Sequence, residues 1–185
     1  MAHVRSSAIR ARLDWVRVHH GQARVEEVIG ALDRHELAIR GAASPNLWIP
    51  FDAYVALNTE IDRRFGIGDL SLCRVLGRYT AEVNLPTLYR IFYKIGTPTY
   101  ILSKVSAVWS AHYDSGIASS RPVPDGVIIR VESFATPHRC MCLSVLGWLE
   151  QTVTIAGAEL IDAREVMCRL RDGNACEFRL LYREP

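Results

Sequence analysis

Apolar residues recur at helical spacing through the first two thirds of the chain. Near the N-terminus, Ile9, Leu13 and Val16 fall on one helix face, and residues 25–32 repeat the pattern. The stretch Gly41-Ala-Ala-Ser-Pro45 then breaks it. This pattern predicts an N-terminal helical extension or hairpin over residues 1–45. It is followed by a single globular unit over residues 46–185.

The larger unit opens with further helices. A proline and a terminal glycine delimit a helix over residues 50–65, and an aspartate can cap the next helix over residues 69–83. A short segment follows over residues 86–95. A threonine–proline pair then starts a helix over residues 97–112, and another such pair starts the last helix, over residues 136–154.

Near the C-terminus, the residue composition becomes typical of β-strands and turns. Residues 115–126 are mostly turn or edge strand, and residues 127–134 have a strand composition. Two further strands, residues 158–169 and 175–182, flank an Asp-Gly pair, which is a strong hairpin signal. The fold class is therefore α+β: a helical N-terminal part is followed by a small antiparallel sheet that packs against helices.

Four residues near this hairpin form a candidate metal site. A turn centred on Asp172-Gly173 places Cys168 opposite Cys176, close enough to share a metal ion. Cys142 lies on the apolar stripe of the last helix, which must face the sheet. Glu165 is three residues before Cys168, so it needs a bulge to reach the same face. Three thiolates and one carboxylate favour zinc or an iron–sulfur centre, and a closed set of four is structural.

Simpler interpretations remain open for these residues. The cysteines can be buried small hydrophobes, and Cys168 can form a reversible disulfide with Cys176. His138 lies one turn before Cys142 and can replace Glu165 as a ligand. Cys73 and Cys140 have no partner at a metal-binding spacing, and we interpret them as core or surface thiols.

The spacing Cys142-x4-Gly147, then Glu165-x2-Cys168-x7-Cys176-x-Phe178, resembles the 4-vinyl-reductase-type (V4R) domain and the phenol-sensing domains of NtrC-type activators. In those sensors a Cys and a Glu-x2-Cys-x7-Cys set hold zinc. The resemblance therefore implies a structural zinc on Cys142, Glu165, Cys168 and Cys176. These domains share a fold with haem-NO-binding domains and with TRAPP vesicle-tethering subunits. The haem-ligating histidine has no assignable counterpart, so haem is not expected.

A longer stretch, about residues 48–178, resembles an uncharacterised stand-alone family abundant in myxobacteria. The resemblance rests on Phe51-Asp-Ala-Tyr54, Gly77-Arg-Tyr79, residues 84–93 and residues 137–147. This resemblance supports the predicted fold but does not indicate a function, because a fold does not determine function.

Aromatic residues offer a candidate ligand pocket, at Tyr89, Tyr93, Trp109, His112 and Tyr113. The rings of such a cluster provide apolar walls, and the polar atoms at the ends of some side chains can bind a ligand, as is usual in ligand sites. A packed aromatic core is the competing interpretation.

The composition narrows the function classes. A net charge of +2 does not indicate a basic surface for binding nucleic acid. No apolar run is long enough for a signal peptide or for membrane insertion. The five cysteines then indicate reduced thiols or metal ligands, and we expect the protein in the cytoplasm. No hydrolase, P-loop or HExxH motif is present, so we do not expect an enzyme. We expect a zinc-stabilised sensor or docking module that binds a small apolar molecule or a protein partner. The alternative is a TRAPP-like scaffold or assembly subunit without a small-molecule pocket. We expect a homodimer.

Overall fold

The computed structural model describes residues 1–44, 46–88 and 97–184. Its helices are α1 (Ser6–His20), α2 (Gln22–Gly30), α3 (Glu36–Gly41), α4 (Phe51–Phe65), α5 (Leu72–Leu88), α6 (Pro98–Ser103), α7 (Val105–His112) and α8 (Arg139–Ile155), with a 3-10 turn at Asp33–His35. Its strands are β1 (His3–Arg5), β2 (Trp48–Pro50), β3 (Ile117–Val123), β4 (Gly126–Glu132), β5 (Glu159–Met167) and β6 (Cys176–Arg183). Among the described residues, no helix is long and apolar enough to cross a membrane.

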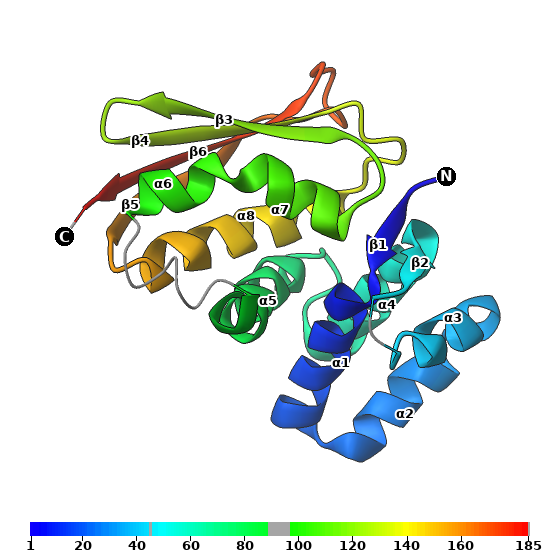
Figure 1. Ribbon diagram of the computed structural model, residues 1–185. Helices are drawn as coiled ribbons and strands as arrows, with labels where there is room; N and C mark the ends of the chain where they lie inside the picture. The colour runs from blue at the N-terminus through cyan, green and yellow to red at the C-terminus, as the bar shows by residue number, and fades with distance from the viewer. Residues whose placement is uncertain (45, 89–96, 185) are drawn as a thin grey trace.

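The four C-terminal strands form one antiparallel sheet in the order β3-β4-β6-β5. Helices α6, α7 and α8 lie along one face of this sheet, and α5 lies on the far side of α8 (Figure 1). Alternate residues of β6 are buried, as expected for a strand with one face against a core. The α+β fold class predicted from the sequence is therefore confirmed.

Helices α5 and α8 are in unusually close contact because glycines lie where they cross. A Cβ atom added at Gly77 would lie 2.1 Å from the carbonyl oxygen of Ser144, and one added at Gly147 would lie 1.9 Å from that of Arg74. Neither site can hold a side chain unless the helices separate. The buried Glu150 carboxylate of α8 adds ion pairs to Arg74 and Arg78 of α5.

Three details differ from the sequence-based prediction. The helix expected over residues 97–112 is two helices, which meet at Lys104. Helix α5 continues through Pro86 to Leu88, and the rest of the short segment expected there lies outside the described residues. The ladder between β1 and β2 was not predicted, because three-residue strands have no readable alternation. The domain boundary near residue 45 stays a prediction, although Val4, Ile9 and Val16 belong to the same buried core as Leu149 and Phe178.

Candidate metal centre and ligand cavity

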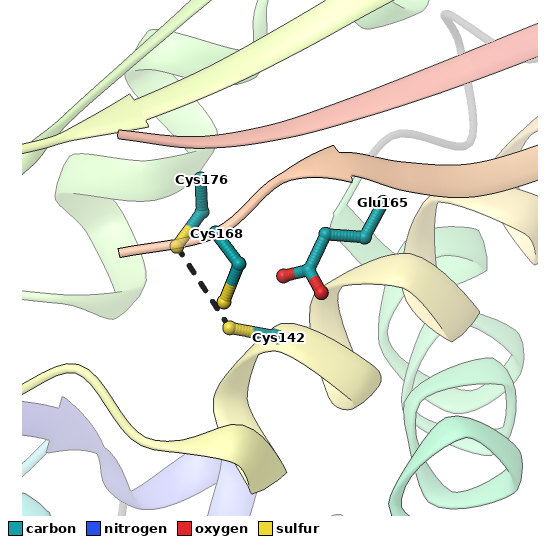
Figure 2. A group of neighbouring side chains, drawn as sticks. All are labelled: Cys142, Glu165, Cys168 and Cys176. Carbon is teal, nitrogen blue, oxygen red and sulfur yellow. Dashed lines mark hydrogen bonds between the residues drawn. The ribbon is translucent and has the colours of Figure 1, made fainter. Parts of the chain in front are cut away.

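The four predicted metal ligands come together at one end of the sheet. Cys142 lies near the start of α8, Glu165 lies on β5, and Cys168 and Cys176 lie on either side of the β5–β6 turn. One ligand atom from each residue can be chosen so that all four lie within 4.8 Å of one another. Figure 2 shows the three sulfur atoms and the carboxylate converging on a common centre.

A β-bulge places Glu165 and Cys168 on the same face of the hairpin. Glu165 pairs with Phe178, whereas Met167 pairs with Glu177, so the register shifts by one residue between them. Because Glu165 pairs with Phe178, it points to the same face as Phe178 and Cys176, which are buried. The shift that follows Glu165 brings Cys168 to this face as well. The turn is closed by the carbonyl of Cys168, which accepts hydrogen bonds from the backbone N–H groups of Arg171 and Gly173.

Burial and mutual hydrogen bonding shift the pKa values of the three thiols in this group. The Sγ atoms of Cys142 and Cys176 are 3.8 Å apart. The hydrogen bond between them raises the pKa of Cys142 and lowers that of Cys176, and burial raises the pKa of Cys168. Cys176 is thus the thiol that ionises most readily.

The Glu165 carboxylate is satisfied on one side only. Its Oε2 atom accepts from Arg139 at 2.5 Å and from Arg171 at 3.0 Å. Its Oε1 atom is buried and has no hydrogen-bond partner among the described residues. Leaving a buried carboxylate oxygen unpaired is costly, so this atom indicates a missing partner. Three thiols and this oxygen form a donor set that suits a soft metal ion.

The other candidates for this site lie outside the group. His138 is the N-cap of α8, and its Nδ1 atom accepts from the backbone N–H of Cys140 at 3.3 Å. Cys73 and Cys140 are buried elsewhere in the core. Burial raises the pKa of the Cys73 thiol to about 12, which makes it chemically inert at neutral pH.

A separate apolar cavity of about 80 Å³ lies between the sheet and the helices. Trp109, His112 and Tyr113, which the sequence singled out, all line it. Tyr89 and Tyr93 lie outside the described residues. Trp109 and Tyr113 stack on each other at 4.4 Å while they border this space, and the role of the cluster as a ligand pocket stays a prediction.

The polar end of the cavity was missed by the sequence analysis. Arg12 is 2% exposed and lines the cavity beside Tyr54 and Ser144. Its guanidinium donates to Tyr54 Oη at 2.6 Å and to Ser144 Oγ at 2.9 Å. The burial of Arg12 could have been inferred from its position in the sequence. Arg12 lies three residues after Ile9 and four before Val16, on the apolar face of its own helix.

Comparison with known proteins places the fold. No family model matches the chain, and no curated protein matches it. Among solved structures, an H-NOX protein from S. oneidensis in the Fe(II)NO ligation state has a TM-score of 0.72 at 11% identity, covering 97% of this chain and 99% of that one. An oxygen-binding H-NOX domain related to soluble guanylate cyclases has a TM-score of 0.72 at 15% identity, covering 98% and 96%. A structure from a study of heme distortion in the H-NOX family has a TM-score of 0.74 at 14% identity, covering 98% and 96%.

The chain therefore has the fold of the haem-NO-binding (H-NOX) domains, which the sequence analysis named only as distant relatives. At these identities the likeness shows the fold alone. The resemblance to the 4-vinyl-reductase-type domain stays a prediction.

The expectation against haem is corrected by the same comparison. It rested on the lack of an assignable histidine, whereas the fold is shared over nearly the whole chain with structures named for their haem chemistry. His112 lines the cavity, and its Nδ1 atom lies 2.9 Å from the carbonyl oxygen of Val108. A carbonyl only accepts, so Nδ1 donates and Nε2 keeps its lone pair in the neutral ring. Burial lowers the pKa of His112, which favours that neutral form.

His112 thus has the arrangement of a metal-binding histidine, whose second ring nitrogen is anchored by a hydrogen bond. The space beside it is smaller than a haem. The cavity measures about 80 Å³, against about 300 Å³ or more for the sites of drug-sized ligands. The donor chemistry fits haem, and the enclosed volume of this conformation does not.

Proposed function

We propose that this chain is a non-enzymatic sensor domain whose ligand is a small molecule bound in the cavity beside Trp109. The observation that carries the proposal is the cavity itself, a largely apolar space between the sheet and the helices with a few buried polar groups in its lining. This combination is the usual anatomy of a ligand site. The H-NOX structures support it, because their names describe binding of NO and of oxygen within the same fold.

The four ligand residues give this sensor a structural metal site. Tetrahedral ligands at the usual zinc–sulfur length of about 2.3 Å place their sulfurs about 3.8 Å apart. The Sγ atoms of Cys142 and Cys176 have that separation, at 3.8 Å. A thiophilic ion bound there would tie the β5–β6 hairpin to α8, and a closed set of four protein ligands leaves no open position for catalysis. The resemblance to the 4-vinyl-reductase-type domain supports the same assignment.

Filling the cavity tests the sensor proposal. Val108 lines the cavity on α7, so Val108→Phe places a larger side chain in it. We expect small neutral apolar probes such as isobutanol to raise the melting temperature of the native chain and to lose this effect in the variant. A probe at 100 times its Kd stabilises by about 2.7 kcal/mol, which is about 5–10 °C for a chain of this size.

The matched control is Val18→Phe, which changes a valine that is 65% exposed on α1. This variant should respond to the probes as the native chain does. If no probe shifts the melting temperature of the native chain, the cavity is a packing defect. The scaffold interpretation, with a protein partner or a second copy of the chain, then replaces the sensor.

A haem-based sensor is the second candidate, and the geometry of His112 favours it. Bound haem would supply an iron centre for a diatomic gas, and His112 is the residue that would hold it. Haem added to the purified chain should give an intense absorption band that His112→Ala removes and His138→Ala keeps, since His138 caps α8 away from the cavity lining. A native chain without the band excludes this candidate.

A further inference from the structure

The polar end of the cavity carries a buried positive charge. The side chain of Arg12 reaches from α1 between α4, α5 and α8, and the residue is 2% exposed. Its partners are the side chains of Asn58, Tyr54, Thr80 and Ser144 and the backbone carbonyl of Leu76. Every one of these acceptors is neutral.

No carboxylate among the described residues forms an ion pair with Arg12. The buried Asp62 is already engaged by the backbone N–H groups of Leu70 and Leu72, and the buried Glu150 by Arg74 and Arg78. A buried charge without a counter-charge is costly even when it is fully hydrogen-bonded. An anion that entered the cavity would recover part of that cost.

The hydrogen-bond network leaves the Ser144 hydroxyl available as a donor for such an anion. The Tyr54 hydroxyl donates to Ser144 Oγ at 3.1 Å, and the Thr80 hydroxyl donates to the Leu76 carbonyl at 2.7 Å. Ser144 Oγ accepts from both Arg12 and Tyr54, so its two lone pairs are used. No described residue accepts its proton. The Ser144 hydroxyl therefore lines the cavity as a donor that two neighbouring donors polarise.

The remaining walls limit the rest of the ligand. Apart from the polar end and His112, the lining is largely aliphatic and aromatic, including Val105, Trp109 and Leu149. The volume of about 80 Å³ is about half of the 150 Å³ apolar cavity that accepts benzene. The ligand body is therefore a short or branched aliphatic group.

We propose that the sensor's ligand is a small aliphatic carboxylate, which accepts a hydrogen bond from Ser144 and balances the charge of Arg12. This inference rests on the proposed function, because it specifies what the cavity binds. It predicts that the cavity distinguishes ligands by charge: a carboxylate should bind more tightly than the neutral amide of the same shape.

The test compares isobutyrate with isobutyramide by calorimetry on the full chain, at neutral pH and constant ionic strength. We expect isobutyrate to bind at least ten times more tightly. Ser144→Ala should weaken isobutyrate binding by about ten-fold or more, because it removes a hydrogen bond to a charged group. Ser110→Ala is the matched control, since Ser110 is exposed and donates only to its own helix, at Ala107.

Each outcome decides between the two proposals. If isobutyramide and isobutanol bind and isobutyrate does not, the carboxylate inference is overturned while the ligand-binding function stands. If isobutyrate binds equally well to the Ser144→Ala variant, the inference is also overturned. If no probe binds the native chain, both proposals fail. Arg12→Met adds a second test, because without the positive charge the cavity should bind isobutyramide more tightly than isobutyrate. If the Arg12→Met variant does not fold, the Ser144→Ala variant alone decides the question.

Discussion

At the residue scale, the candidate metal centre is a group of donor atoms at the end of the β5–β6 hairpin. Cys168 and Cys176 are buried, and the carboxylate of Glu165 leaves one oxygen without a partner. A bound metal ion would satisfy that oxygen and the thiols together. Its binding free energy would be part of the folding free energy, because the unfolded chain does not hold the four ligands together.

Removing one thiol should therefore destabilise the whole domain. We expect Cys168→Ala or Cys176→Ala to lose the metal ion and more than about 4 kcal/mol of stability, which is about 8–16 °C in melting temperature. Elemental mass spectrometry and thermal unfolding measure the two effects. A variant that keeps both its metal content and its melting temperature contradicts the site.

The control for this experiment is Cys140→Ala, which removes a buried thiol that does not belong to the group. This variant should keep its metal ion while losing some packing energy. If it loses the metal ion as well, the effect of the other variants is a general loss of structure.

The sequence could predict the group of four candidate metal ligands but not the polar end of the cavity. Cysteine and glutamate spacing is a local pattern, and a hairpin converts it into proximity. Arg12 interacts with residues 42 to 132 positions away in the sequence, so no local sequence pattern predicts that it forms the polar end of the cavity. An arginine on an apolar face is the one sign, and it also fits a side chain whose charged end reaches solvent.

At the element scale, the α5–α8 pair positions both sites. Ser144 and Cys142 lie on the same stretch of α8, so the distance between α8 and α5 affects the cavity and the metal centre together. Gly77 and Gly147 allow the close approach, and Glu150 holds two arginines of α5.

A methyl group at Gly147 should force these helices apart. The new Cβ would lie 1.9 Å from the Arg74 carbonyl oxygen, which is backbone and cannot move alone. We expect Gly147→Ala to cost about 3 kcal/mol or more in chemical denaturation, as for a severely overpacked core. Gly30→Ala is the matched control, because nothing lies within 4 Å of its added Cβ. It should stabilise α2 by about 0.5–1 kcal/mol. Equal stability of the Gly147 variant and the native chain contradicts the close-packing argument.

The elements themselves were largely predictable, since periodicity and glycine or proline boundaries define α4, α8 and the β5–β6 hairpin. The bulge at Glu165 was recognised as a requirement, but its position depends on the pairing of β5 with β6. The break at Lys104 was not predictable, because α6 and α7 pack separately on β3 and the apolar spacing continues across the break.

At the scale of the whole molecule, segments far apart in the sequence meet around one cavity. Its lining includes Ala8 on α1, Tyr54 on α4, Trp109 on α7, Ile129 on β4 and Leu149 on α8. A ligand there contacts nearly every layer of the fold seen in Figure 1. Binding can therefore change how the sheet, α7 and the N-terminal helices pack, which is the property that a sensor domain needs.

The indole N–H signals in a ¹⁵N–¹H NMR spectrum test this account most directly. The chain has four tryptophans. Trp109 and Trp148 line the cavity, whereas Trp15 and Trp48 lie elsewhere and serve as internal controls. During titration with isobutyrate or isobutanol, we expect the signals of Trp109 and Trp148 to move to saturation and those of Trp15 and Trp48 to stay in place. No movement of any signal, or equal movement of all four, would contradict ligand binding in the cavity.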